Sequence, residues 1–157
     1  MIENVQIRKM TQEEAVEIAD NWKYPEPYSF YNMTADKEDY DEIIDSGTRG
    51  ENFFSVISNS TLLGFFCVFS DKDNTEEAEV DIGMRPDLTG KGLGLRFTNV
   101  IIEYLEKNLK ISVIWFSVAK FNKRAIKVYE RAGFHCIKEK LQKTNGSEYA
   151  FIVMKRG

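Results

Sequence analysis

The chain has 157 residues, of which 43% are hydrophobic and 13% aromatic, so it can form one domain whose core needs neither disulfides nor a structural metal. Its formal net charge of −4 argues against a nucleic-acid coat or a membrane-surface protein, because polyanion-binding proteins are usually basic. The charge is unevenly distributed: residues 1–81 contain 19 Asp and Glu against 6 Lys and Arg, whereas residues 82–157 contain 6 against 15. The uneven charge leaves open the interpretation that one half of the chain binds an anionic ligand and the other half a cationic ligand.

The signals for redox state, targeting and metal binding are few. Cys67 and Cys136 have no short spacing and lie in apolar surroundings, so we expect two buried free cysteines. Residues 1–10 lack the apolar stretch of a signal peptide, and the longest apolar run, residues 62–69, is too short to span a bilayer. His135 is the single histidine, which argues against a histidine-rich metal site. We therefore expect a cytoplasmic protein with no membrane association and no metal.

The first fifty residues predict one strand and two helices. An alternating run at 5–9 fits a strand, and the Thr-Gln-Glu-Glu sequence at 11–14 fits a capping box that begins a helix over about 12–22. The aromatic segment 24–33 contains two prolines, which cannot continue a helix. The acidic stretch 36–46 predicts a second helix.

The rest of the chain alternates between strand and helix signals. A glycine-rich turn at 90–94 opens a long amphipathic helix, and a second helix is predicted over 122–132. Strands are predicted over 53–58, 62–70, 77–84, 111–118, 134–141 and 149–155. This order predicts a single α+β domain over 1–157, with a mixed, mostly antiparallel sheet of about six or seven strands and about four flanking helices.

The segment with the clearest chemistry is 86–94, Pro-Asp-Leu-Thr-Gly-Lys-Gly-Leu-Gly, between a predicted strand and a predicted helix. Its three glycines let the backbone approach a ligand and turn N–H groups toward it, and the helix adds its positive dipole end. Lys91 and Arg96 add formal charge, so the loop suits a pyrophosphate. The alternative is a flexible glycine turn that merely enters a helix.

Two common nucleotide motifs fit this loop poorly. A Walker A loop requires G-x-x-x-x-G-K-S/T, whereas Lys91 is followed by glycine. A dinucleotide fingerprint requires G-x-G-x-x-G in an early βαβ unit, whereas here Gly94 comes one residue early and about halfway along the chain.

The loop resembles the GNAT superfamily of acetyl-CoA-dependent N-acetyltransferases, whose signature Q/R-x-x-G-x-G/A follows a strand and opens a helix. Thr89 stands where Arg or Gln is usual. A second block, residues 122–134, is similar to the family pattern N-x-x-A-x-x-x-Y-x-x-x-G-F. The resemblance covers nearly the whole chain and is weakest at residues 20–50. It implies that the fourth and fifth strands splay apart.

The resemblance also implies where acetyl-CoA binds. The backbone of Ile82, Gly83 and Met84 would pair with pantetheine, and Gly83 suits a β-bulge. Asn122 matches an amide that contacts the coenzyme, although it also suits a helix N-cap. The residues that would wrap the pyrophosphate are Thr89, Gly90, Lys91, Gly92, Leu93, Gly94 and Leu95. The basic residues that could reach the 3′-phosphate are Lys120, Lys123, Arg124 and Lys127.

For catalysis, Tyr129 matches the tyrosine that protonates the leaving thiolate, and the alternative is a core aromatic residue. An amine acceptor must lose a proton, so a base is needed. Glu79 is the first candidate and Asp81 the second, directly or through water, because both lie on one face of the predicted strand 77–84. A solvated acidic face is the alternative. His135 is a weaker candidate base, since it begins a strand after the helix.

Tyr28 and Tyr31 lie in the segment where the family builds its acceptor pocket, although they could simply pack this loop onto the sheet. The function implied is acetyl transfer by direct attack to a small-molecule or protein amine. The alternative is a non-catalytic acyl-CoA-binding or sensing module. A homodimer is possible by analogy with the family.

Overall fold

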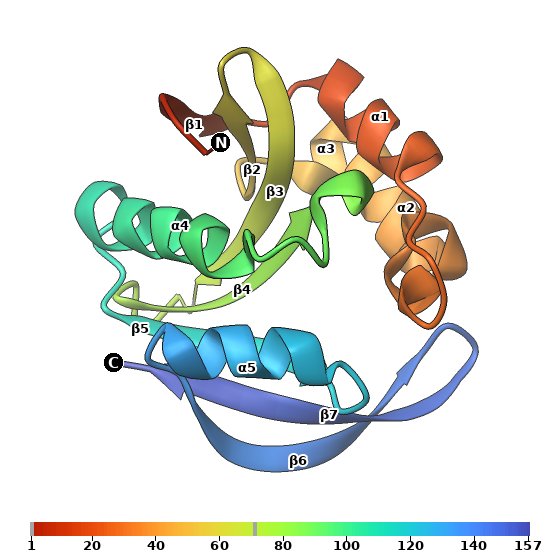
Figure 1. The fold of residues 1–157 in the computed structure, drawn as a ribbon, viewed down its shortest axis with the longest axis vertical. Helices are drawn as coiled ribbons and strands as arrows, with labels where there is room; N and C mark the ends of the chain where they lie inside the picture. Colours follow the sequence, from red (N-terminus) through yellow and green to blue (C-terminus); the bar gives the residue numbers. More distant parts are fainter. Residues whose placement is uncertain (1, 71) are drawn as a thin grey trace.

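The computed structural model describes residues 2–70 and 72–157, and these form one seven-stranded sheet in the order β1-β2-β3-β4-β5-β7-β6 (Figure 1). The strands are β1 (Val5–Lys9), β2 (Phe53–Ser58), β3 (Thr61–Ser70), β4 (Glu77–Met84), β5 (Val113–Ala119), β6 (His135–Thr144) and β7 (Ser147–Arg156). Neighbouring strands run antiparallel except β4 and β5, which are parallel. The predicted mixed, mostly antiparallel sheet is therefore confirmed.

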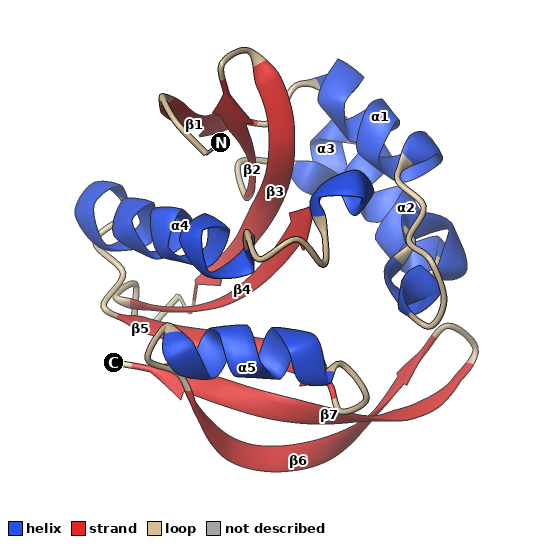
Figure 2. Ribbon diagram, viewed as in Figure 1, coloured by secondary structure: helices blue, strands red, loops and turns tan. Residues whose placement is uncertain are grey.

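The helices are α1 (Gln12–Asn21), α2 (Lys37–Ile44), α3 (Ser46–Arg49), α4 (Gly94–Asn108) and α5 (Lys123–Arg131) (Figure 2). The expected capping box begins α1, since Glu14 N–H donates to Thr11 Oγ1 and Thr11 N–H donates to Glu14 Oε1. The helix predicted over 36–46 is instead two helices, because Asp45 adopts an extended backbone and its side chain caps α3. No helix in the described residues is long and apolar enough to cross a membrane.

Short 3-10 helices replace the irregular loops expected around the two prolines and before the glycine loop. They are Tyr28–Tyr31, Met33–Ala35 and Pro86–Leu88. The first two carry the aromatic segment between α1 and α2, so this segment has a defined backbone.

Each face of the sheet has its own hydrophobic core. Helices α4 and α5 cover one face and lie beside each other (Figure 1), with Phe66 and Leu105 fully buried between α4 and the sheet. Helices α1 and α2 pack against the other face, where Ile18 and Ile43 are fully buried. Successive side chains of β4 point to opposite faces, so Val80 is buried beneath α4 whereas Asp81 faces the side of α1 and α2.

The sheet opens between β4 and β5. These strands pair only at Glu77–Val113, Ala78–Ile114 and Glu79–Trp115. Beyond Glu79, β4 continues to Met84 along β3, while β5 continues to Ala119 along β7. The predicted splay is confirmed, and it leaves one edge of the end of β4 without a neighbouring strand.

Two expectations are wrong. Gly83 forms no bulge, since the β3–β4 register runs without a shift; a Cβ atom there would lie 2.3 Å from the ring of Phe65, so glycine is needed for space. Cys136 is exposed rather than buried, because it lies on the edge strand β6, which has a neighbour on one side only. Cys67 is buried as expected.

Candidate active site

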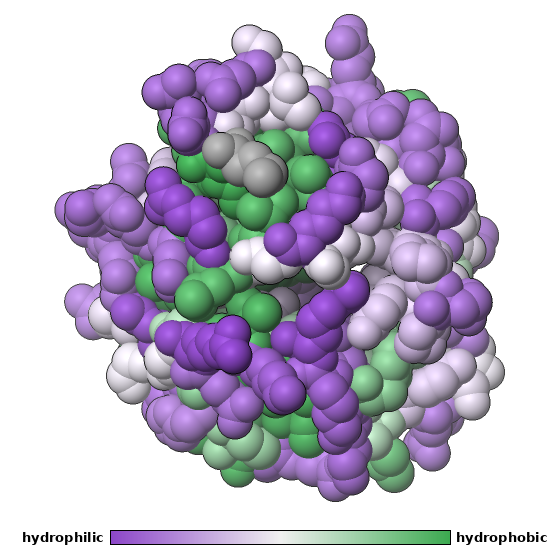
Figure 3. Space-filling model, viewed as in Figure 1, coloured by the Kyte–Doolittle hydropathy of each residue, from purple (hydrophilic) through white to green (hydrophobic). Residues whose placement is uncertain are grey.

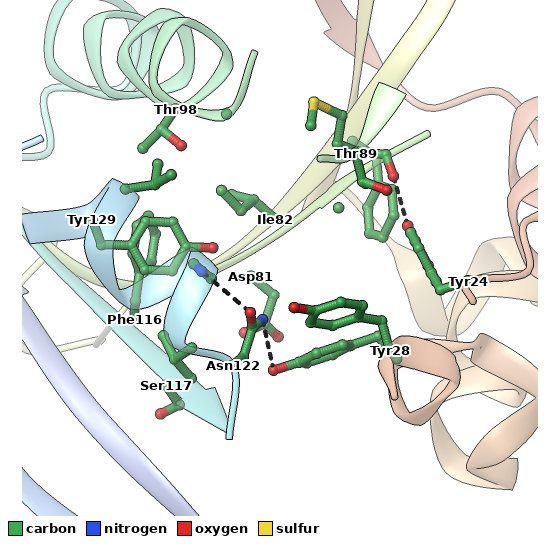
Figure 4. Close-up of a pocket in the computed structure, with 18 of the residues that line it drawn as sticks. Tyr24, Tyr28, Asp81, Ile82, Thr89, Thr98, Phe116, Ser117, Asn122 and Tyr129 are labelled. Atoms are coloured by element: carbon green, nitrogen blue, oxygen red, sulfur yellow. Dashed lines mark hydrogen bonds between the residues drawn. The ribbon is translucent and has the colours of Figure 1, made fainter. Parts of the chain in front are cut away.

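A cavity of about 590 Å³ occupies the gap between the splayed strands (Figure 4). Its lining comes from both faces of the sheet: α4 and α5 on one side, and α1, α2 and the aromatic segment between them on the other. Figure 3 shows that the corresponding face of the molecule is hollowed near its centre. Because the cavity passes through the sheet, a ligand held by α4 and α5 can meet a second ligand from the opposite face.

The N-terminus of α4 faces this cavity without a cap. Among the α-helices of residues 2–70 and 72–157, α4 alone has no side chain bonded to its first N–H groups. The preceding loop holds Gly90 at φ +72° and Gly92 at φ +78°, a backbone conformation that favours glycine. Free N–H groups at the positive end of a fifteen-residue helix are a binding site for an anion such as phosphate.

Helix α5 packs closely on this loop and supplies a cation. A Cβ atom at Gly94 would lie 3.3 Å from Val128, which explains the third glycine of the motif. The Arg124 guanidinium lies 4.2 Å from the centre of the Tyr28 ring and within 3.0 Å of the Cβ position of Gly90. Arg124 therefore crosses the cavity from α5 and reaches both the glycine loop and the aromatic segment.

The other basic residues of this region lie differently. Lys91 and Lys127 are exposed and do not line the cavity, and neither does Leu93 of the predicted pyrophosphate loop. Lys120 pairs with Glu139 at 2.5 Å. Thr89, Gly90, Gly92, Gly94 and Leu95 do line the cavity.

The free edge of β4 offers backbone groups to the cavity. Arg85 N–H donates to Leu63 O of β3 at 2.8 Å, whereas the carbonyl of the preceding Met84 accepts from the Tyr24 hydroxyl at 2.7 Å (Figure 4). Since backbone groups alternate in direction along a strand, Ile82 and Met84 face the opening and Gly83 faces β3.

Tyr129 lies on α5 with its ring against Phe116, at 4.5 Å between centroids, and its hydroxyl directed toward the cavity (Figure 4). The hydroxyl has no hydrogen-bond partner among the described residues. Burial raises the pKa of Tyr129 above its usual range, and nearby Tyr31 and Asp81 add to the rise. This phenol is therefore protonated at neutral pH and free to donate. Tyr129 combines core packing with an available hydroxyl, so the two interpretations of its role coexist.

The two candidate bases have different surroundings. Asp81 is enclosed by protein but faces the open space of the cavity, and burial raises its pKa to about 7, with Glu79, Asp39 and Glu42 adding repulsion. Glu79 accepts a 3.4 Å hydrogen bond from the Ser117 hydroxyl. A carboxylate whose pKa lies near neutrality suits proton transfer at neutral pH, which favours Asp81 over Glu79. His135 does not line the cavity.

The aromatic segment closes one side of the cavity. The Tyr31 hydroxyl accepts hydrogen bonds from Ala119 N–H at 3.3 Å and from Asn122 Nδ2 at 3.2 Å. Asn122 also caps α5 by accepting from Ala125 N–H, so the predicted N-cap is confirmed, whereas its contact with the coenzyme stays a prediction. Tyr28 and Tyr31 line the cavity and also pack within an aromatic cluster.

Several cavity residues were not singled out in the sequence. Thr98 is buried on α4 and lines the side of the cavity formed by α4 and α5. Asp39 and Glu42 line the opposite side from α2. They belong to the acidic stretch predicted as a helix over 36–46, and their spacing of three residues places both on one face of that helix.

The glycine loop at an uncapped helix N-terminus, beside splayed parallel strands, suits a phosphate-bearing ligand. A family model described as an acetyltransferase (GNAT) domain matches residues 4–135, so the chain belongs to the GNAT acetyltransferase family. An uncharacterized N-acetyltransferase of Methanocaldococcus jannaschii is 34% identical over 90 residues, which are 54% of this chain and 39% of that protein. The chain thus spans about two fifths of the length of this relative.

Solved structures show the same fold. A spermidine N-acetyltransferase from Vibrio cholerae in complex with CoA and spermine has a TM-score of 0.72 at 19% identity, covering 97% of this chain and 94% of that one. A ribosomal-protein-S5-alanine acetyltransferase from Vibrio fischeri has a TM-score of 0.67 at 19% identity, covering 99% and 94%.

Proposed function

We propose that this protein transfers an acetyl group from acetyl-CoA to a primary amine. The observation that carries the proposal is the meeting of an uncapped helix N-terminus, a free strand edge, a protonated tyrosine and a carboxylate of near-neutral pKa in one cavity. When bound, acetyl-CoA supplies an activated acetyl thioester. Similar structures are named for acetylation of spermidine and of an alanine of ribosomal protein S5, so small-molecule and protein amines are both conceivable acceptors.

Coenzyme binding is assigned to the face that carries α4 and α5. The N–H groups of the glycine loop and of the first turn of α4 bind phosphate oxygens, and Arg124 contributes the nearest formal charge. The outward backbone groups of Ile82 and Met84 bind the amide-bearing arm of the coenzyme as an added strand would.

The chemical step uses groups from both faces. Asp81 takes a proton from the acceptor ammonium, directly or through water, so that the neutral nitrogen can attack the thioester carbon. A backbone N–H on the free edge of β4 stabilises the developing oxyanion. The C–S bond then breaks, and Tyr129 donates its proton to the departing sulfur. The nitrogen, which is positively charged after the attack, releases its second proton, and this proton restores the Tyr129 phenol directly or through water. Cys67 is unsuited to an acyl-enzyme, because burial raises its thiol pKa, and Cys136 does not line the cavity. This supports direct transfer between two bound substrates.

The test is a panel of amines incubated with acetyl-CoA, with release of free thiol as the readout. Thermal-shift titrations with coenzyme A, ATP and NAD run in parallel. Stabilisation by coenzyme A in preference to the nucleotides, with thiol release that depends on an amine, supports the proposal. Binding of coenzyme A without transfer to any amine would instead favour a sensing module, and preference for ATP or NAD would overturn both.

A further inference from the structure

Four carboxylates from two elements line the end of the cavity opposite the coenzyme face. Asp39 and Glu42 come from α2, whereas Glu79 and Asp81 come from β4. Asp39 and Glu42 both raise the pKa of Asp81, so the two pairs lie near enough to repel each other. The fold thus gathers negative charge on the side from which an acceptor would enter.

Among the described residues, these four carboxylates have no oppositely charged partner, whereas neighbouring acidic residues on α2 are paired or cap the helix. On the same helix, Asp41 pairs with Lys37 and Asp36 caps the first turn. By contrast, none of the four carboxylates forms an ion pair among the residues that the structure describes, and the Asp81 side chain has no hydrogen bond there either. Lys140 acts on Asp81 only as a minor opposing charge.

The reacting amine loses its positive charge during the reaction, so it cannot neutralise the four carboxylates throughout. For transfer to occur, the attacking nitrogen passes its proton to Asp81, so that this nitrogen and this carboxyl both become neutral. The charges of Asp39 and Glu42 are then still uncompensated. A second positive group on the acceptor would stay charged throughout and could neutralise them.

We propose that the acceptor is a small diamine or polyamine, whose reacting nitrogen faces Asp81 while a second ammonium binds Asp39 and Glu42. The apolar chain between the two nitrogens lies along Trp22 and Phe65, which line the same part of the cavity. This inference rests on the proposed function and narrows its acceptor to a multiply charged amine.

The first test compares 1,4-diaminobutane with its mono-N-acetyl derivative, which keeps one primary amine on the same carbon chain but lacks the second charge. Binding to the protein saturated with coenzyme A is measured by calorimetry, and turnover by thiol release. We expect the diamine to bind about tenfold more tightly or better, as one additional ion pair in a partly enclosed site allows. Equal affinity for the two compounds would overturn the inference.

The second test uses the double variant Asp39→Asn, Glu42→Gln, with Asp41→Asn as the matched control on the same helix outside this cavity. At pH 8.5, where Asp81 is ionised with or without its acidic neighbours, the double variant should raise KM for the diamine about tenfold and change KM for the monoacetylated amine little. The control should change neither. Equal losses for both amines would show a merely structural effect and overturn the inference.

Because binding and turnover are measured separately, a failure of the cationic subsite can be distinguished from a failure of acetyl transfer. Preferential binding of the diamine without any thiol release would contradict acetyl transfer while leaving the cationic subsite in place. Turnover that is equally efficient with both amines would support acetyl transfer and remove the cationic subsite.

Discussion

The two ends of the cavity are built in different ways. The coenzyme end consists mainly of backbone: the glycine loop, the first turn of α4 and the free edge of β4 are nearly continuous in the chain. The acceptor end consists of side chains that come from α1, α2, β4 and the aromatic segment. A site made of backbone requires glycines at fixed positions and so leaves a motif, whereas a site made of side chains depends on how distant elements pack.

The two ends also differ in charge. The excess of acidic residues in the first half of the sequence gathers partly on α2 and β4, while basic α5 with Arg124 borders the glycine loop. The cavity therefore joins a surface suited to an anionic ligand with one suited to a cation. Substitutions that affect one end of the cavity and leave the other end unchanged can test this comparison of the two ends.

Tyr129 lies where the two ends of the cavity meet, and the loss of its hydroxyl should have the largest effect. Tyr129→Phe removes the proton donor but keeps the ring that packs on Phe116, so kcat should fall about 100-fold or more. Coenzyme affinity should stay within about twofold, measured by calorimetry. Wild-type turnover in the variant would exclude Tyr129 as the acid.

Asp81 is expected to set the pH dependence from the acceptor end. Because its pKa lies at about 7 and only the carboxylate can accept a proton, kcat/KM should rise with pH up to about 7 through this group. Asp81→Asn should lower kcat/KM about 10- to 100-fold and remove this rise.

The matched control for Asp81 is Glu79→Gln, measured over the same pH range from 5.5 to 8.5. Because Glu79 is bonded to Ser117 and is not the carboxylate assigned as the base, this variant should keep the rise. If Glu79→Gln removes the rise and Asp81→Asn keeps it, the two roles are reversed.

Gly92→Ala tests the coenzyme end alone. A side chain at φ +78° strains the backbone by about 1–2 kcal/mol, so the loop should shift and weaken coenzyme binding about tenfold. Gly146→Ala is the control, because Gly146 has the same φ and open surroundings but lies in the β6–β7 turn. Both variants should lose similar stability in thermal unfolding, and only Gly92→Ala should lose affinity. Equal affinity in the two variants would contradict a binding role for the loop.

The smallest expected effect distinguishes the basic residues of α5. Arg124→Met should weaken coenzyme A binding about three- to tenfold and reduce its salt dependence, because Arg124 reaches the glycine loop. Lys127→Met should have less effect, since Lys127 does not line the cavity. A larger loss with Lys127→Met, measured at two salt concentrations, would reverse this assignment.

Local signals predicted most of the fold. The capping box at Thr11 and Glu14 and the alternation in β4 depend on neighbours within a few residues, and the structure contains both. One boundary was missed although its cause is also local: Asp45 divides one predicted helix into two by accepting from Gly47 N–H and capping α3.

The structure changed the interpretation of particular positions. Gly83 was expected to permit a bulge. Position 83 instead requires glycine because the ring of Phe65 on the adjacent strand leaves no space for a side chain. Cys136 looked buried from its apolar neighbours in sequence, but edge strand β6 leaves it exposed.

By itself, the sequence determined the fold class and the position of the glycine loop, because glycine conformation, strand alternation and helix periodicity are local properties of the chain. The tertiary structure decided which side chains share the cavity. Only packing brings Asp39 and Glu42 of α2 near Asp81 of β4, and only the splay of β4 from β5 brings Asp81 near Tyr129. Electrostatic effects depend on distance in space rather than in sequence, so the near-neutral pKa of Asp81 and the acidic acceptor end emerge only after folding.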